Sequence, residues 1–302
     1  MITWLLVIIL SYLFFGLSSL GDKLVLNNSN NPKLYVFYVG ILNLIVILLI
    51  PFFGLYLPNS ENFFWIILTS FSFIAGLYFL YYTVNKFEVS KVIPIVGAIQ
   101  PILVLLLSWF LLGYGIINFN NLIAFLILLI GSVIISFEEK IKFTGLLLKL
   151  SLIASFLMAL VFVFTKFVFL NQSFVNGIIW IGIFNFLFGS IYFFDKSVRK
   201  EFFVKKNNNY KNKTIYLVLF AQLTGGLAGI LQNFAIYLAP ASSLAILNAL
   251  RGVQYVFLFI IILIFSKFLP NILKEEISRK LVIQKTTAII LIVIGLAFLI
   301  IS

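Results

Sequence analysis

The stretch GAIQPILV, residues 97–104, returns in altered form as RGVQYVFL at residues 251–258. Both stretches lie in long apolar segments, and the alignment places Arg251 against Gly97 and Gln254 against Gln100. An arginine inside an apolar segment is costly to bury, so its presence needs a physical reason. The two stretches predict a chain built from two related halves, of which only one carries a buried cation.

Further matches occur in the same order along the two halves of the chain. They are GDKLVL (21–26) with FTKFVFL (164–170), GILN (40–43) with GIFN (182–185), AG (75–76) with AG (228–229), and Ala124 and Gly131 with Ala288 and Gly295. The offset between matched positions grows only where the second half has longer polar loops. We therefore expect a duplication, with a first repeat at 1–142 and a second at 143–302.

The composition excludes an ordinary soluble protein. The 302 residues are 63% hydrophobic and only 10% charged, which is far too little charge for a soluble surface of this size. The chain has no cysteine and no histidine, which excludes disulfides, thiolate chemistry and the usual zinc sites. The fold class expected is an all-α polytopic membrane protein, and we expect no enzyme activity and no cofactor.

Apolar segments of about 20 residues are long enough to cross a bilayer core. By that measure the sequence predicts ten continuous transmembrane helices at 2–21, 35–57, 63–84, 89–112, 119–137, 144–170, 174–194, 214–237, 241–266 and 282–301. Each half then contains five spans, and because five is odd, the second half enters the membrane from the opposite side. This predicts two inverted five-helix repeats, an arrangement found in many secondary transporters.

The basic residues are distributed unequally between the loops. All but three of the 21 lysines and arginines lie in or beside the loops after odd-numbered spans; the exceptions are Lys149, Lys166 and Arg251. The positive-inside rule makes those loops cytoplasmic and places both termini outside. The net charge of +12 is accordingly interpreted as a topology signal, and we expect no nucleic-acid partner.

The order of spans and several motifs resemble the drug/metabolite transporter superfamily, in particular its EamA-like branch. The motifs are SKVIPIVGAIQPILVLLLSWFLLG (90–113), APASSLAILNALRGVQYVFLFIIILIFS (239–266) and the Thr165–Lys166 pair. The resemblance implies a ten-helix transporter of amino acids and related metabolites, with both termini in the cytoplasm, opposite to the charge pattern. Two positions depart from the family pattern, since Tyr114 stands where a glutamate is common and Tyr255 where a proline is common.

Arg251 is the leading candidate for solute binding. It lies near the middle of its span, and all nine acidic residues of the chain lie in loops or at span ends. We expect it to bind a carboxylate or phosphate of the solute; the alternative is a structural pair with carbonyls or amides of a neighbouring helix. Asn248 and Gln254, three positions to either side, share its helix face. The lack of an intramembrane carboxylate argues against proton-coupled export of cations.

Other polar and aromatic residues complete the predicted site. For the amides, the alternative to solute binding is interhelical hydrogen bonding. For Lys166 it is extension of the side chain to the membrane interface, and for the aromatic residues it is lipid contact or packing. The predicted substrate-binding residues are Arg251, Asn248, Gln254, Gln100, Asn43, Asn185, Gln232, Lys166, Trp180 and Tyr78. The predicted kink or gating residues are Pro94, Pro101, Gly97, Gly225 and Gly226, with close helix crossing as the alternative for the two glycines of TGGLAG.

The function that these observations favour is a secondary transporter or facilitator. It would move amino acids or related carboxylate-bearing solutes by alternating access, as a monomer, in a plasma (inner) membrane of bacterial type. The alternatives are a transporter of phosphorylated or lipid-linked solutes and a membrane subunit that transports nothing. The expected partners are a small-molecule solute and the lipid bilayer.

Overall fold

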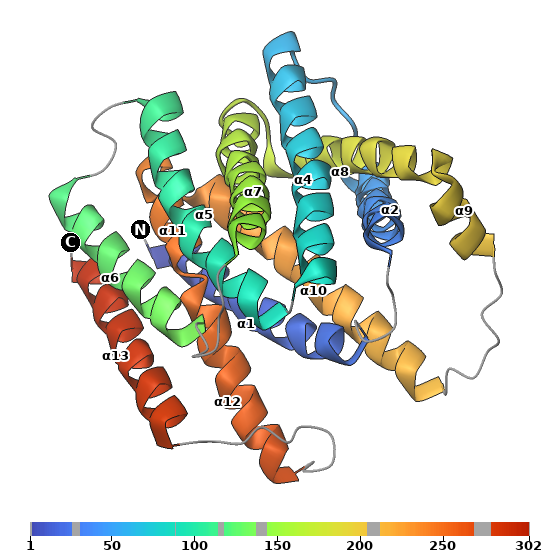
Figure 1. Cartoon of the computed structure of the whole chain (residues 1–302). Helices are drawn as coiled ribbons and strands as arrows, with labels where there is room; N and C mark the ends of the chain where they lie inside the picture. Colours follow the sequence, from blue (N-terminus) through green and yellow to red (C-terminus); the bar gives the residue numbers. More distant parts are fainter. Residues whose placement is uncertain are drawn as a thin grey trace. The chain divides into compact units, whose positions relative to one another are not determined.

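A computed structural model describes residues 2–25, 31–87, 89–113, 118–136, 144–203, 212–268 and 279–301, and these residues form helices joined by short connections (Figure 1). The principal helices are α1 (Ile2–Val25), α2 (Pro32–Asn43), α4 (Ser60–Lys86), α5 (Val89–Leu112), α6 (Phe119–Ser136), α7 (Gly145–Asn171), α8 (Phe174–Ser190), α9 (Lys196–Phe203), α10 (Asn212–Leu238), α11 (Leu244–Ala249), α12 (Gly252–Phe268) and α13 (Arg279–Ile301). Short helical pieces extend three of them: η2 (Leu44–Leu49) and α3 (Ile50–Phe53) after α2, η3 (Ile191–Phe194) after α8, and η4 (Ala241–Ser243) before α11.

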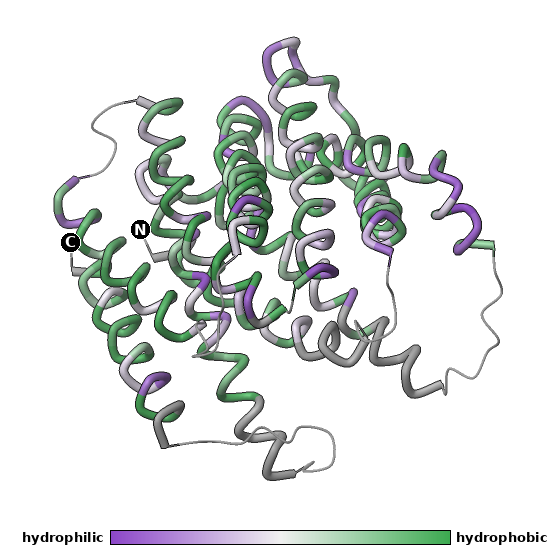
Figure 2. Tube along the Cα trace, in the orientation of Figure 1, coloured by the Kyte–Doolittle hydropathy of each residue, from purple (hydrophilic) through white to green (hydrophobic). Residues whose placement is uncertain are grey.

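The surface of the protein is that of a membrane protein. Large apolar side chains are exposed along the helices, among them Phe52, Phe110 and Phe119, with 81%, 71% and 74% of their surface accessible. Figure 2 shows hydrophobic residues along the helices and hydrophilic residues mainly near helix ends. Exposed apolar surface of this extent is stable only in a lipid environment, so the predicted polytopic all-α membrane fold is confirmed.

The predicted spans coincide closely with the helices. Eight helical segments within the described residues are long and apolar enough to cross a membrane, and Thr3–Ser19 forms a shorter apolar helix. The ten predicted spans are therefore not all reproduced by this measure. The prediction of unbroken helices was wrong for three spans. The second passes through η2 and α3, the seventh changes to η3, and the ninth is divided into η4, α11 and α12.

The chain forms two compact units that each combine segments from both halves of the sequence. The first unit contains residues 1–27, 108–139 and 213–302, and the second contains 28–107 and 140–212. The predicted boundary between the repeats, at residues 142 and 143, lies outside the described residues, and the division into two repeats stays a prediction.

In the second unit, α2 and α8 cross at a contact where neither helix has a side chain. A Cβ atom on Gly40 would lie 2.8 Å from the Cα atom of Gly189 and 3.2 Å from the Asn185 carbonyl oxygen. A Cβ atom on Gly182 would lie 2.8 Å from the Asn43 carbonyl oxygen. Glycine is needed here because any side chain would separate the helices.

Helix α4 contacts both α2 and α8 of this crossing and also packs on α7. The most extensive contact is between α4 and α7, where Gly76 of α4 leaves room for Leu157 and Met158 of α7. The α5 residues Val92, Ile95 and Val96 pack with Leu147 and Ala154 of α7 in a buried apolar cluster.

In the first unit, α6 and α13 lie side by side (Figure 1). Gly131 of α6 faces Ile292 of α13, and Gly295 of α13 faces Leu128 of α6; in both cases an added Cβ atom would come within 2.8 Å of the facing side chain. Gly131 and Gly295 are partners in the predicted repeat, and so are Leu128 and Ile292, since both pairs have the same offset. The two helices therefore make reciprocal contacts, and α12 packs on α1 and α6 beside them.

Candidate functional site

The ninth span is interrupted at the arginine that the sequence singled out. Between α11 and α12 the backbone N–H of Arg251 donates to the Asn248 carbonyl (3.1 Å), and the N–H of Gln254 donates to the Arg251 carbonyl (3.0 Å). These are i to i+3 hydrogen bonds, so the segment is wound more tightly than an α-helix. The tighter turn removes carbonyls from the regular α-helical pattern, and they require other partners.

Side chains from two other helices of the first unit supply those partners. The Tyr12 hydroxyl of α1 donates to the Leu247 carbonyl (2.9 Å), and the Ser132 hydroxyl of α6 donates to the Ala249 carbonyl (2.7 Å). Both side chains are buried. Ser132 reaches its acceptor because Gly252 has no side chain, and a Cβ atom there would lie 2.9 Å from the Ser132 Cα atom. The break is thus a defined part of the fold, with its backbone groups hydrogen-bonded.

The same winding aligns the predicted binding residues. In a segment with i to i+3 hydrogen bonds, side chains three positions apart are eclipsed. Asn248, Arg251 and Gln254 therefore project from one line along the broken span. Arg251 interacts electrostatically with the hydroxyls of Tyr12 and Tyr255, and the side chain of Gln232 in α10 is hydrogen-bonded to Tyr12. Two of the predicted residues, Arg251 of the broken span and Gln232 of α10, thus interact with Tyr12.

Two amide oxygens in this group lack partners. Oδ1 of Asn248 and Oε1 of Gln254 are buried and accept no hydrogen bond from the described residues. The orientation of the Gln254 amide is fixed by its neighbour: its Nε2 donates to Ser19 Oγ (3.1 Å), and Ser19 in turn donates to the Phe15 carbonyl (2.8 Å). Buried acceptors without donors are rare and costly, which makes them candidates for ligand contacts.

The second unit holds the other predicted binding residues. The Asn185 side chain donates to Oδ1 of Asn43 (3.0 Å), so this pair forms the interhelical hydrogen bond that was the alternative to solute binding. Gln100 of α5 is 2% exposed and Lys166 of α7 is 5% exposed. Lys166 is therefore buried within its span and does not extend to the surface. Its predicted role at the rim of a solute pathway stays a prediction.

The two predicted aromatic residues also lie in the second unit and have packing partners. The Trp180 indole N–H donates to the Tyr56 carbonyl (2.9 Å), and Asn176 accepts a hydrogen bond from the Tyr56 N–H (3.2 Å), so the chain after α3 is fixed to the start of α8. Tyr78 stacks on Tyr192 with ring centroids 5.6 Å apart. A role for either ring in solute binding stays a prediction.

The predicted kink and gating residues behave differently from one another. α5 continues through Pro94, Gly97 and Pro101 without interruption, although its repeat partner, the ninth span, is broken. A Cβ atom on Gly225 would lie 2.8 Å from the Ser18 hydroxyl, whereas one on Gly226 would meet no atom within 4 Å. Close helix approach, the alternative weighed for both glycines, therefore applies to Gly225 and not to Gly226.

Sequence reasoning missed Tyr12, Ser19 and Ser132, which support the broken span. None belongs to a repeated motif, and hydroxyl side chains are common in membrane helices. The available signal was Gly252 directly after Arg251, since a glycine inside a span marks close approach of another element. That signal indicates that another helix approaches the span at Gly252, but it does not indicate which residue of that helix makes the contact.

The sequence of the first half of the chain matches a known family. Residues 2–137 match the EamA-like transporter family. Over that range the chain is similar to this family. The resemblance expected from the motifs is thereby confirmed, and the coarse function that the EamA-like family supports is transport of small solutes across a membrane.

Solved structures give the same fold over the whole chain. One crystal structure, described only as that of a protein, aligns with 98% of this chain and 95% of its own, with a TM-score of 0.71 and 13% sequence identity. At this identity the likeness shows the fold alone. No curated protein matches the chain in sequence.

Proposed function

We propose that this protein is a secondary transporter or facilitator of amino acids and related zwitterionic metabolites, and that Asn248, Arg251 and Gln254 bind the solute. The observation that carries the proposal is the alignment of Arg251, an arginine within a membrane span, with two unpartnered amide oxygens on one face of a broken helix. Discontinuous helices with hydrogen-bonded ends are a common way to build solute sites inside membranes.

The chemistry of the three side chains matches a zwitterion. The Arg251 guanidinium offers a planar pair of donors to a carboxylate, and such charge-assisted contacts are short and strong. An ammonium group carries three N–H donors and no acceptor. Oδ1 of Asn248 and Oε1 of Gln254 are acceptors in need of such donors. An α-amino acid has both groups on one carbon atom, so its ammonium group could donate to the two amide oxygens while its carboxylate accepts from Arg251.

A phosphorylated solute fits the site less well. A phosphate ester at neutral pH is mainly an acceptor, so it would satisfy Arg251 and leave both amide oxygens without donors. It remains the second candidate for solutes whose phosphate is accompanied by amino or hydroxyl groups. A third possibility, a subunit that transports nothing, does not account for the two unpartnered acceptors beside the arginine.

The coupling mechanism follows from where the acidic residues lie. All nine are in loops or at span ends, so a membrane-embedded carboxylate for proton exchange is missing from the sequence. We therefore favour facilitated movement or exchange of solutes over proton-driven export. The protein would act as a monomer in a plasma membrane of bacterial type.

Alternating access would use the predicted inverted repeats. Reciprocal contacts between repeat partners support that architecture. Gly40 contacts Asn185, and their repeat partners Gly182 and Asn43 contact each other in the same way. Likewise Gly131 contacts Ile292, and their repeat partners Gly295 and Leu128 contact each other. Contacts of this reciprocal kind are what a two-fold axis between two copies of one motif produces.

Transport into proteoliposomes tests the proposal. The purified full chain is reconstituted and the uptake of radiolabelled amino acids is compared with that of the corresponding amines and carboxylic acids, each of which lacks one charged group. We expect uptake of the zwitterions alone, abolished by Arg251→Gln. Lys149→Gln, which removes a positive charge from an exposed position of α7, is the matched control and should transport normally.

The other outcomes separate the alternatives. Arg251-dependent uptake of sugar phosphates or glycerol phosphate without uptake of amino acids would replace the proposal by its second candidate. Uptake of no solute in the panel, by protein that remains folded, would favour a subunit without transport activity.

A further inference from the structure

Helix α9 follows directly after a membrane-spanning segment and has a strongly polarised surface. Its sequence is KSVRKEFF, and it begins two residues after the end of η3, which closes the span at 174–194. A helix in this position lies where the protein leaves the bilayer. Its eight residues are too few to cross a membrane and enough to form two turns at the interface.

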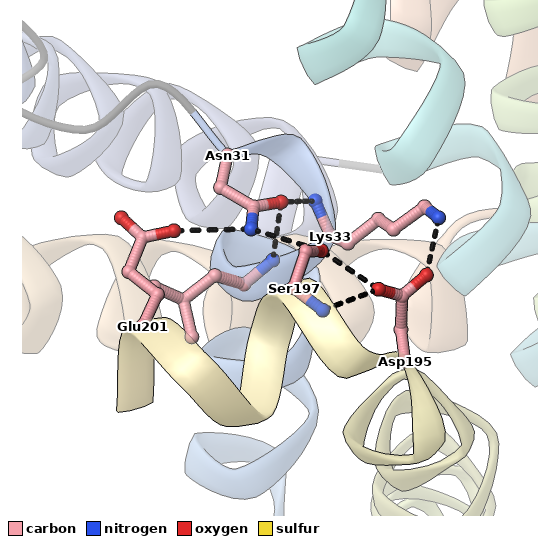
Figure 3. Close-up of polar contacts among 6 residues, drawn as sticks. Asn31, Lys33, Asp195, Ser197 and Glu201 are labelled. Atoms are coloured by element: carbon pink, nitrogen blue, oxygen red, sulfur yellow. Dashed lines mark hydrogen bonds and ion pairs between the residues drawn. The ribbon is translucent and has the colours of Figure 1, made fainter. Parts of the chain in front are cut away.

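One face of α9 is fixed to α2 within the second unit (Figure 3). Val198 is fully buried and packs with Leu34 and Phe37 of α2. The Asn31 side chain donates to Glu201 (3.0 Å) and to Ser197 (3.4 Å). These contacts hold the helix in one rotational orientation.

Both acidic residues of the segment are used in this attachment. Asp195 pairs with Lys33 and accepts two hydrogen bonds from Ser197, at 2.8 Å from its N–H and 2.7 Å from its hydroxyl. Glu201 accepts from Asn31. The carboxylates that might have neutralised the basic residues of α9 are thus turned toward α2.

The opposite face of α9 is basic and aromatic. Lys196, Arg199, Lys200 and Phe203 are spaced at i, i+3, i+4 and i+7, so they share one side of the helix, and they line a shallow surface hollow. All four are exposed, Phe203 to 70% of its surface. The three basic side chains form no ion pair or hydrogen bond with any described residue.

We propose that this face binds the phosphate groups of anionic phospholipids. Basic side chains with an aromatic neighbour are the composition of interfacial amphipathic helices, in which the cations contact phosphates and the ring enters the boundary of the acyl chains. The position beside a span brings the three cations to headgroup depth, where each adds attraction to an anionic leaflet. Because α9 is fixed to α2, the bound lipids would hold the end of α8 and the start of α2 at the membrane surface.

Native mass spectrometry of the full chain in detergent, with phosphatidylglycerol or phosphatidylcholine added, tests this proposal. We expect the wild type to retain phosphatidylglycerol in preference to phosphatidylcholine. The triple variant Lys196→Gln/Arg199→Gln/Lys200→Gln should lose that preference, with affinity lower by on the order of a hundredfold for three basic contacts. Inorganic phosphate at millimolar concentration should not displace the lipid, which separates a headgroup site from a site for free phosphate.

The matched control is Lys86→Gln/Lys91→Gln/Lys149→Gln, which removes the same charge from α4, α5 and α7 of the second unit. It should retain phosphatidylglycerol as the wild type does, and circular dichroism should show both variants folded. Equal loss in both variants would overturn the proposal in favour of a general effect of net charge. Full retention of the preference by the α9 variant, or displacement by inorganic phosphate, would overturn it as well.

Discussion

The side chains of Asn43 and Asn185 are joined by a direct hydrogen bond, with Asn185 Nδ2 donating to Asn43 Oδ1 over 3.0 Å. The two residues come from positions 142 apart, and they are partners in the predicted repeat. They meet at the crossing of α2 and α8, one turn from the glycines that allow the close approach. A motif that contacts its own copy in this way fixes the helix pair at its centre.

Replacing these asparagines should reveal their coupling. Asn185→Leu leaves the Asn43 amide oxygen without its donor, and Asn43→Leu leaves Asn185 without its acceptor, so each should lower the Tm. The loss of unfolding free energy in the double variant should be smaller than the sum of the losses in the two single variants. The difference should be about 0.6 kcal/mol, an average value for side-chain hydrogen bonds inside membrane proteins. The measurement is a double-mutant cycle by thermal unfolding in detergent. Strict additivity would mean that the bond contributes nothing.

Glycines with different surroundings provide a matched pair of substitutions. Gly182→Ala would press its methyl group against Val46 and the Asn43 carbonyl, whereas Gly226→Ala has free space. We expect Gly182→Ala to lower the Tm by an amount that corresponds to about 1–3 kcal/mol of overpacking. Gly226→Ala should leave the Tm unchanged or raise it, because alanine favours helix by up to about 1 kcal/mol. Similar effects of both changes would contradict the helix crossing.

The broken span should depend on the hydroxyls that hold it. Tyr12→Phe removes the donor to the Leu247 carbonyl, and Ser132→Ala removes the donor to the Ala249 carbonyl. Each leaves a buried carbonyl unsatisfied, at a cost of about 1–3 kcal/mol. Hydrogen exchange of the amides at 250–254 should become faster in both variants. Thr287→Ala is the control, since its hydroxyl bonds only within α13 at an exposed position. Unchanged exchange at 250–254 would show that the break needs neither hydroxyl.

The attachment of α9 should be insensitive to pH over the neutral range. The hydrogen bond from the Lys33 side chain, followed by those from Ser197, lowers the pKa of the Asp195 carboxyl below its ordinary value. A carboxyl with a lowered pKa stabilises the folded form above its ordinary pKa, and this contribution is lost as the pH falls through the lowered value. Hydrogen-exchange protection of α9, corrected for intrinsic rates, should therefore be constant from about pH 5 to pH 8.

Two substitutions distinguish this ion pair from the neighbouring amide contact. Asp195→Asn should reduce protection of α9 at every pH, because it loses the charge that holds Lys33. Glu201→Gln keeps an oxygen that accepts from Asn31, so it should have little effect. Loss of α9 protection near pH 6 in the wild type would show that Asp195 titrates at a higher pH than its partners predict.

The sequence predicted the fold well because bilayer thickness sets the length of an apolar helix. The fourth predicted span, 89–112, has the same bounds as α5, and the fifth, 119–137, differs from α6 by one residue. Helix breaks were not predictable in this way. The two prolines of α5 suggested a kink there, yet the break lies at Arg251, where hydroxyls from α1 and α6 replace the lost hydrogen bonds.

The candidate site was predictable in part. Asn248, Arg251 and Gln254 were grouped from their spacing of three, and the i to i+3 winding places them on one line. Their support from Tyr12, Ser19 and Ser132 depends on which helices become neighbours, and that is decided by packing between distant segments. Trp180 was predicted to bind the solute from its aromatic character, and this stays a prediction. Its indole N–H bonds the Tyr56 carbonyl, a partner 124 positions away that no local pattern indicates.

Ligand-dependent thermal stabilisation tests most directly whether Arg251 and its two amide neighbours bind a zwitterion. The wild type, Arg251→Gln and the control Lys149→Gln are purified, and their Tm values are measured with each amino acid that the proteoliposomes take up and with its amine analogue. We expect a concentration-dependent rise in Tm for the wild type and the control with the amino acid alone. For Arg251→Gln the apparent affinity should fall by at least about tenfold, since hydrogen bonds to charged groups contribute about 1.5–3 kcal/mol. Equal stabilisation of Arg251→Gln and the wild type by the same amino acid would show that the solute binds elsewhere and that Arg251 is a structural residue of the broken span.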